Sequence, residues 1–510
     1  MNENFNTMKQ KNRLALLIVF SITASLPVFS ENHSRESADY VNPFWGTSFF
    51  GHTFPGPCLP NGLVHLSPDT GTKGWTYAAG YNYADESIIG FSHTHWSGVG
   101  MVNGGEVMLM PVTGTRLRVN PGTPENPDKG YRSRFSHQNE TASPGYYSVL
   151  LEDYNIKAEL TATRRAGFHR YTFPETENAR IILDLGHQIG DMNSEEDSKL
   201  MIKNNNRIEG AKSAGLGKVW FVAEFSKPFR YYGTFDASYV TPESGGSIFP
   251  YKSGEKGKKI GAFVTFSTHE KENILVKVGI SYTSLEGARK NLHAEIPGWN
   301  FDEIKHQARK IWNRELSKII LRETTPDKKE IFYSALYRSL LAQYISQDVD
   351  GKFFGSDGKI HTAKGFDFYG SFSCWDTYRS QHPLLTLIAP EHVNDYIRSI
   401  EEKVKNYQWL PAQHFLNIFG ESMVGDHLIP VIVDAWMKGF RDFDVDALYM
   451  AMRQKALKNP SPPVPDYAGR SGLDYYLKQG YVPVDKVTES VPNTLEMAYD
   501  DWCIAQLAND

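Results

Sequence analysis

The spacing of apolar residues changes once along this chain, and the change divides it into two parts. Between Tyr40 and about Tyr282, apolar and polar residues alternate in short runs that Gly, Pro and Asn interrupt. One such run places on a single face Ile156, Ala158, Leu160 and Ala162. Alternation with frequent turn residues is typical of antiparallel sheets packed face to face. Residues 38–282 are therefore predicted to form a β-sandwich.

Two helices are predicted next, over residues 284–296 and 300–321, because apolar residues recur there at helical spacing. Pro297 and Gly298 separate them, and Asn300 with Glu303 is typical of an N-terminal capping pair. We expect residues 283–322 to be a helical linker.

After Thr325 the helical period continues, in stretches separated by long loops rich in Gly, Pro and aromatic residues. The predicted stretches begin with a stripe formed by Ile331, Ala335, Leu336, Leu340 and Tyr344. A second helix starts at Pro390, and others lie near 425–438, 444–457 and 494–507, the last capped by Asn493. This rhythm is typical of an α/α toroid, in which loops at one end build the site. About six helices are roughly half of a closed toroid and would leave an apolar face exposed, so we expect residues 323–510 to be its first part, in a truncated chain.

Composition narrows the function classes. A net charge of −5 gives no electrostatic case for nucleic-acid binding. Aromatic residues make up 13% of the chain, which suits a protein that handles carbohydrates. The cysteines at 58, 374 and 503 are too few and too scattered for a disulfide framework or a thiolate metal site.

The N-terminus has the pattern of an export signal. Lys9, Lys11 and Arg13 precede an apolar run over 14–22, and small residues up to Ser30 offer a cleavage site. The run is too short for a membrane span, and no other segment is apolar enough. Residues 1–30 therefore predict a periplasmic or secreted protein, with a retained anchor as the alternative.

The stretch from Gly370 to Pro390 places Trp375, Asp376 and Arg379 before an apolar helix. An indole can lie on the C–H face of a sugar ring, while a carboxylate and a guanidinium bind its hydroxyl groups. The alternative is structural: Asp376 caps the helix and pairs with Arg379 three residues later.

Two loops in the first half are unlike ordinary strand connections. One runs from Gly51 to Gly62 and continues to Trp75, and the other places His93 and His95 two residues apart. A His-x-His pair suggests metal binding, but no third ligand is near. A polar loop that shapes a ligand site and a buried histidine pair are the other two possibilities.

The motifs together resemble glycoside hydrolase family 92, the calcium-dependent exo-α-mannosidases of Bacteroidetes. In the first half the resemblance rests on Tyr40-Val-Asn-Pro-Phe-Trp-Gly-Thr47, Gly51-His-Thr-Phe-Pro-Gly-Pro57, Leu66-Ser-Pro-Asp69, Gly90-Phe-Ser-His-Thr-His95 and Val278-Gly-Ile-Ser281. It continues through Glu286-Gly-Ala-Arg289, Glu295-Ile-Pro-Gly-Trp299, Ser373-Cys-Trp-Asp-Thr-Tyr-Arg379, His382-Pro-Leu-Leu-Thr386 and Thr494-Leu-Glu-Met-Ala-Tyr-Asp-Asp-Trp502.

The resemblance implies a β-supersandwich, a helical linker and an incomplete (α/α)6 toroid of the six-hairpin glycosidase type. It implies removal of non-reducing mannose, with α-1,2 linkages expected, from N-glycans or mannans with inversion. It also implies a calcium ion that binds O2 and O3 of the sugar. Trp375 and Asp376 are expected at the cleaved mannose and Trp75 at the neighbouring subsite. Arg379, His93 and His95 complete the expected substrate-binding set.

The sequence departs from the family where the chemistry is expected. The general acid of the family lies in a Glu-Gly-Asn-Ala-Trp motif, the calcium ligands near Gly-Asn-Glu-Pro-Ser-His-His, and the base near Gly-Gln-Met-Ser-Ala-Trp; none occurs in residues 1–510. Glu496, Asp500 and Asp501 are interpreted as structural, and Asp426 and His427 as residues that shape the toroid. We therefore expect no catalytic residue or calcium ligand within this chain. The alternative function is an inactive carbohydrate-binding fragment.

Overall fold

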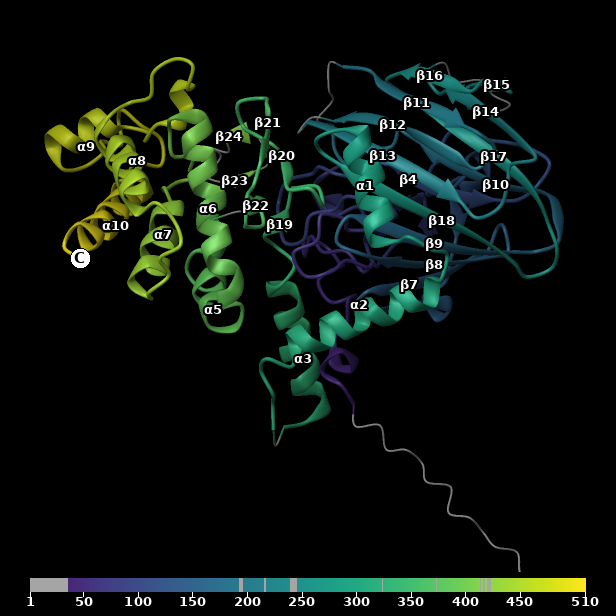
Figure 1. Ribbon diagram of the computed structural model, residues 1–510, viewed down its shortest axis with the longest axis horizontal. Helices are drawn as coiled ribbons and strands as arrows, with labels where there is room; N and C mark the ends of the chain where they lie inside the picture. The colour runs from purple at the N-terminus through teal and green to yellow at the C-terminus, as the bar shows by residue number, and fades with distance from the viewer. Residues whose placement is uncertain are drawn as a thin grey trace, which may run out of the picture. The chain divides into compact units, whose positions relative to one another are not determined.

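The computed structural model describes residues 35–191, 196–214, 217–238, 245–322, 324–372, 374–412, 414–415, 418–419 and 423–510 (Figure 1). The predicted export signal, at 1–30, lies outside these residues. Residues 36–510 belong to one compact unit. Within the described ranges, no helix combines the length and hydropathy that a membrane crossing requires.

Two antiparallel sheets make up the first half of the described chain. The order in the seven-stranded sheet is β1 (Ser67–Asp69), β3 (Gly90–Ser92), β4 (Met108–Val112), β10 (Thr176–Asp184), β17 (Ile260–Thr268), β14 (Tyr231–Asp236) and β15 (Ser247–Pro250). The nine-stranded sheet has the order β16 (Gly254–Gly257), β11 (Ser198–Lys203), β12 (Arg207–Ala214), β13 (Gly217–Phe225), β18 (Glu272–Ser281), β9 (Ala166–Phe173), β8 (Ile156–Ala162), β7 (Tyr146–Leu151) and β6 (Glu140–Ser143). A short pair, β2 (Ser87–Ile88) and β5 (Ser133–Arg134), lies outside both sheets.

The core of the sandwich lies between these sheets, and the apolar residues of the predicted alternation belong to it. The four apolar residues of β8, Ile156, Ala158, Leu160 and Ala162, are all fully buried. They share one hydrophobic cluster with Ile182 of β10 and Val264 of β17, from the other sheet. Alternate residues of a strand point to opposite faces, so a period of two puts all four side chains into the same core.

Helices α1 (Leu285–Glu295) and α2 (Phe301–Leu316) pack on the nine-stranded sheet and so do more than connect two domains. Phe301 of α2 and Leu292 of α1 form a separate cluster with Phe168 and Val222 from that sheet. The predicted cap of α2 is confirmed, since Oδ1 of Asn300 accepts a hydrogen bond of 3.1 Å from the Glu303 amide. The helix ends at Leu316 rather than at residue 321.

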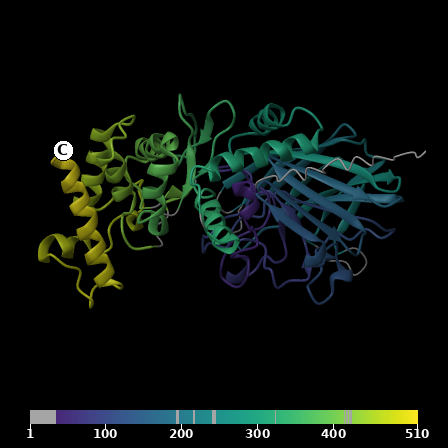
Figure 2. The same cartoon turned by 90° about the horizontal axis from the view of Figure 1, so that it is seen from below.

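The second half is helical, as predicted. Its helices are α3 (Pro326–Ser339), α4 (Cys374–Thr377), α5 (Gln381–Ile388), α6 (Pro390–Tyr407), α7 (Leu428–Met437), α8 (Val445–Leu457), α9 (Leu473–Gln479) and α10 (Ser490–Ala508). Short strands interrupt them: β19 (Tyr344–Ile345), β20 (Lys352–Phe354), β21 (Ile360–Thr362), β22 (Tyr369–Phe372), β23 (His414–Phe415) and β24 (Ile418–Phe419). Helix α10 packs against α7 and α8 and ends close to the C-terminus, in yellow in Figure 2.

Two local predictions for this half were wrong. Tyr344 belongs to β19 and not to the preceding helix, which ends at Ser339. Asn493 does not cap the last helix, because α10 already begins at Ser490. The Asn493 side chain instead donates to the carbonyl of Glu489 over 3.0 Å.

The segment before β1 connects the sandwich to the helices through buried hydrogen bonds. The indole of Trp312 in α2 donates to the carbonyl of Cys58 over 2.8 Å, and Asn61 donates to the carbonyl of Gln343 over 2.9 Å. From the loop between β3 and β4, the amide of Ser97 also donates a partly buried hydrogen bond of 3.2 Å to the hydroxyl of Tyr344. Tyr344 pairs with Ser371 of β22, the strand that leads into α4, so the sandwich loops help to position the start of that helix.

Candidate functional site

Helix α4 and the turn that follows it carry Trp375, Asp376 and Arg379, which the sequence singled out. Trp375 is half-buried, whereas Asp376 and Arg379 are exposed. The Arg379 guanidinium lies 4.9 Å from the centre of the Tyr378 ring, and its Nη2 is 3.5 Å from Oε1 of Glu496 in α10. Arg379, one of the three predicted binding residues, therefore lies beside a carboxylate from a helix more than a hundred residues later in the sequence.

His427, at the start of α7, lies in the middle of this group. Its ring stacks on Tyr378 with centroids 4.0 Å apart, and it lies 5.9 Å from the Trp375 ring. Its Nε2 is 3.8 Å from Oε2 of Glu496, and its Nδ1 is 3.9 Å from Oδ1 of Asp500. Burial lowers the pKa of His427, although the nearby carboxylates of Glu496 and Asp426 oppose that effect. Neither ring nitrogen has a hydrogen-bond partner in the described part of the chain.

A buried charge cluster lies next to His427. Asp426 is 3.0 Å from the ammonium of Lys455 and 2.7 Å from Nε of Arg470, which also donates to Asp501 over 2.7 Å. Burial alone would raise the pKa of Asp426, but the two cations lower it below its usual range. This arrangement supports the interpretation of Asp426 and Asp501 as structural.

Asp500 differs from its neighbour Asp501. It is fully buried, and its Oδ2 accepts a hydrogen bond of 2.8 Å from the Asp426 amide. Burial, followed by the negative charge of Asp426, raises the pKa of Asp500 well above its usual range. Asp500 is therefore protonated over a wider pH range than an exposed aspartate.

A cavity of about 200 Å³ adjoins this cluster, and Asp426, Arg470, Asn493 and Asp500 contribute to its lining. Among the described residues, Nη2 of Arg470 and Oδ1 of Asp500 are buried without a hydrogen-bond partner. The first atom is a donor and the second belongs to a carboxyl group. A hydroxyl group both donates and accepts, so a polyol or sugar hydroxyl suits this pair chemically.

Trp75 lies in a short 3-10 helix of the sandwich half, and 53% of its surface is exposed. Its ring meets the His52 imidazole edge-on, with centroids 4.9 Å apart, and His52 in turn meets Phe50 at 6.3 Å. An exposed indole held by a neighbouring ring can serve as a sugar platform.

His93 lies inside the sandwich core and is fully buried. Its Nδ1 lies 2.6 Å from the carbonyl of Val107, and its Nε2 is 3.1 Å from Nε2 of His169. His169 in turn bonds to the hydroxyl of Tyr171 over 2.8 Å. Burial lowers the pKa of His93 to about 4.

His95 is also buried and belongs to a different network. Its Nδ1 faces the carbonyl of His65 at 2.6 Å, and its Nε2 faces Oδ1 of Asp69 at 2.8 Å. His187 contacts the other oxygen of Asp69, also at 2.8 Å. Burial alone would raise the pKa of Asp69, but the two histidines lower it well below its usual range.

These contacts agree with one of the three possibilities for His93 and His95, that of buried histidines. His93 is 0% and His95 2% exposed, so both are core residues rather than residues of a surface site. That His93 and His95 bind substrate stays a prediction, and the contacts proposed below rest on Trp75, Trp375, Asp376 and Arg379. Sequence spacing could not reveal this, because the partners of the two rings come from distant strands.

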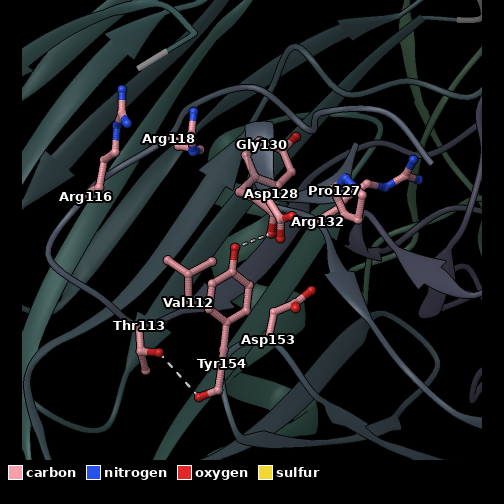
Figure 3. Close-up of a pocket in the computed structure, with 11 residues that line it drawn as sticks. Val112, Thr113, Arg116, Arg118, Pro127, Asp128, Gly130, Arg132, Asp153 and Tyr154 are labelled. Atoms are coloured by element: carbon pink, nitrogen blue, oxygen red, sulfur yellow. Dashed lines mark hydrogen bonds between the residues drawn. The ribbon is translucent and has the colours of Figure 1, made fainter. Parts of the chain in front are cut away.

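A second cavity, of about 230 Å³, lies in the sandwich half and is lined in part by Arg116, Arg118 and Arg132 (Figure 3). Figure 3 shows the Tyr154 ring in its middle, with the guanidinium of Arg132 pointing away. The Tyr154 hydroxyl donates to the carbonyl of Tyr131 over 3.0 Å, and Arg132 donates to the carbonyl of Thr70 over 2.7 Å. Because the basic groups do not converge, this cavity is a weaker candidate than the one beside α10.

The described residues do not fit a calcium ion. In these ranges no group of three or more His, Cys, Asp or Glu side chains is placed to hold a metal. The carboxylate of Asp426 already lies between Lys455 and Arg470, whose positive charges disfavour a cation there.

The chain is a β-sandwich followed by a helical domain, and two glycoside hydrolase family models match these two parts. The model of the glycosyl hydrolase family 92 N-terminal domain matches residues 40–281, and that of the family 92 catalytic domain matches residues 287–510. The chain belongs to glycosyl hydrolase family 92.

Solved structures agree with this assignment. The family GH92 α-mannosidase BT3965 from Bacteroides thetaiotaomicron, in complex with mannoimidazole, is 38% identical with a TM-score of 0.85, covering 93% of this chain and 61% of that one. The inverting mannosidase BT2199 from the same organism is 28% identical with a TM-score of 0.82, covering 93% and 62%. An uncharacterized secreted glycosidase from Arthroderma benhamiae is 26% identical over 92% of this chain and 59% of its own length. The chain thus spans about three fifths of the length of these relatives.

Proposed function

We propose that this chain is part of an exo-acting, inverting α-mannosidase that removes non-reducing, α-1,2-linked mannose from N-glycans or mannans. The observation that supports the proposal most is the match of both family 92 domains over nearly all of residues 40–510. Two similar structures are described as mannosidases, one of them as inverting. The relative described as secreted supports a periplasmic or secreted location.

In this proposal the residues of the chain bind and orient the sugar. The half-buried indole of Trp375 packs on the C–H face of the mannose ring, and the exposed carboxylate of Asp376 accepts hydrogen bonds from its hydroxyl groups. Arg379, beside Glu496, donates to a further hydroxyl. Trp75 supports the neighbouring sugar through its exposed face.

Inversion requires two carboxyl groups about 6.5–9.5 Å apart, one acting as acid and the other as base on a water molecule. We assign neither role to a residue of this chain, because the three sequence motifs that carry the acid, base and calcium ligands in the family do not occur in it. The proposal likewise derives no step through calcium.

The absence of those motifs favours a second candidate function, in which residues 1–510 bind mannosides without hydrolysing them. The two candidates share the binding residues and differ only in turnover. Hydrolysis of a p-nitrophenyl α-mannoside by the purified chain distinguishes them, and NMR of the released mannose shows whether the anomeric configuration is inverted.

The binding step is tested by calorimetry with methyl α-mannoside. Asp376→Ala is expected to abolish detectable binding, because the ring loses a carboxylate acceptor for its hydroxyl groups. Asp485→Ala is the matched control, since Asp485 is exposed and its ion pair is with the adjacent Lys486. Unchanged affinity in the Asp376 variant would remove that residue from the site, and loss of binding in both variants would point to a general effect of charge.

A further inference from the structure

The nine-stranded sheet has a groove beside α1 that the proposed function does not use. Its volume is about 620 Å³, within the range of about 300–1,000 Å³ of small-molecule pockets. It is lined by residues of β11, β12, β13 and β16 and by Leu285 at the start of α1. Figure 1 shows β12 and β13 next to α1, with β11 and β16 further along the sheet.

Strand register places Lys199, Met201, Trp220 and Lys256 on one face of the sheet. Lys199 of β11 lies opposite Lys256 of β16 on one side and Ala211 of β12 on the other, and Ala211 lies opposite Trp220 of β13. Directly paired residues of neighbouring strands share a face, so this row crosses the sheet on the groove side. Met201, two residues after Lys199, lies on the same face.

The floor of the groove is apolar. Met201 is 45% exposed although it is a large hydrophobic residue, and the half-buried indole of Trp220 lies in the same lining. Leu285, the first residue of α1, also lines the groove. A site with this floor favours a ligand with an alkyl or other apolar body.

The charges that line the groove are unbalanced. Its two glutamates are already paired with other residues: Arg289 binds Glu209 at 2.8 Å, and Lys252 binds Glu255 at 2.7 Å. In the described part of the chain, Lys199 and Lys203 have no carboxylate within ion-pair distance, and the Lys199 ammonium instead lies 4.8 Å from the centre of the Trp220 ring. The third lysine, Lys256, is 3.7 Å from Asp197.

We infer that this groove binds an organic anion with an alkyl chain, of the long-chain carboxylate type. The alkyl chain of the ligand lies on Met201, Trp220 and Leu285, and its carboxylate pairs with the ammonium groups of Lys199 and Lys203. The inference is independent of mannose binding, because the groove lies on the outer face of the sandwich and shares no lining residue with the site around α4.

Decanoate tests this inference by isothermal titration calorimetry with the whole chain, with 1-decanol as the neutral probe. We expect saturable binding of decanoate and at least about tenfold weaker binding of decanol, because only the anion can form an ion pair with the lysine ammonium groups. The double variant Lys199→Glu/Lys203→Glu should lower decanoate affinity by about tenfold or more.

The matched control is Lys359→Glu/Lys364→Glu, which changes the net charge equally at exposed lysines outside the groove. It should bind decanoate as the unaltered chain does, and so should Asp376→Ala. Equal loss in both double variants would show a non-specific charge effect and overturn the inference. Absence of decanoate binding to the unaltered chain, or equal binding of decanol, would overturn it as well.

Discussion

Nε2 of His93 and Nε2 of His169 lie 3.1 Å apart in the sandwich core. Each ring has a second hydrogen-bond partner, which determines which of its nitrogens carries the proton. His93 donates through Nδ1 to the carbonyl of Val107, so its Nε2 is the acceptor in the neutral ring. His169 then donates through Nε2 and accepts the Tyr171 hydroxyl proton at Nδ1. A second proton on His93 would leave two Nε2 donors facing each other, and burial lowers the pKa of both rings, so both are neutral.

This pair predicts that the protein loses stability in mild acid. The folded pKa of His93, about 4, is below the ordinary value of 6.5, so the unfolded chain binds more protons between these two values. The stability that the neutral ring contributes is present above pH 6.5 and is lost as the pH falls toward 4. For His93 alone the loss at pH 5 amounts to about 2 kcal/mol, measurable as a lower midpoint of urea unfolding at pH 5 than at pH 7.

A variant isolates the contribution of His93 to this pH dependence. His93→Asn keeps a donor for the Val107 carbonyl but cannot gain a charge, so its stability should fall less between pH 7 and pH 5. His306→Asn replaces an exposed histidine and should retain the slope of the unaltered chain. An unchanged slope in His93→Asn would contradict the assignment.

Asp69 should be far more important for stability than an exposed aspartate. It is fully buried between His95 and His187, and Asn in its place would lose the charge that both rings contact. Breaking a buried pair of this kind typically costs about 3–5 kcal/mol. Denaturant unfolding of Asp69→Asn should show this loss, while Asp128→Asn, on the surface beside Arg134, should leave the midpoint unchanged. Equal midpoints for the two variants would contradict the prediction.

Two tryptophans should respond in opposite ways to replacement by alanine. Trp312 is fully buried, and its loss should destabilise the fold by about 3–5 kcal/mol and break the hydrogen bond to Cys58. Trp75 is 53% exposed, so Trp75→Ala should change stability by no more than about 0.5 kcal/mol. The same variant should weaken binding of a mannobiose that reaches the neighbouring subsite. Thermal unfolding and calorimetry measure the two effects separately, and unaltered mannobiose affinity would remove Trp75 from the site.

The local sequence pattern was sufficient to predict a structural feature wherever the interaction that causes the feature joins residues close together in the sequence. Alternation in β8 predicted which side chains face the core between the sheets, because a strand has two faces, but Glu159 and Thr161 on the other face are buried as well. Asn300 and Glu303 predicted the start of α2, because the capping hydrogen bond joins residues three apart. Asn493 shows the limit of the same rule. The cap pattern is present there, but α10 already begins at Ser490, and the Asn493 side chain bonds to the carbonyl of Glu489 instead.

The sequence by itself determined the β-sandwich, the helical half and the family, since these depend on periodicity and on ordered motifs. Only the tertiary structure decided that His93 and His95, two residues apart, are buried in different networks with His169 and Asp69. Only the packing of α7 on α10 brought His427 between Tyr378 and Asp500. The physical reason is that the partner of a buried polar group is set by which strands and helices pack together, and spacing along the chain does not encode that choice.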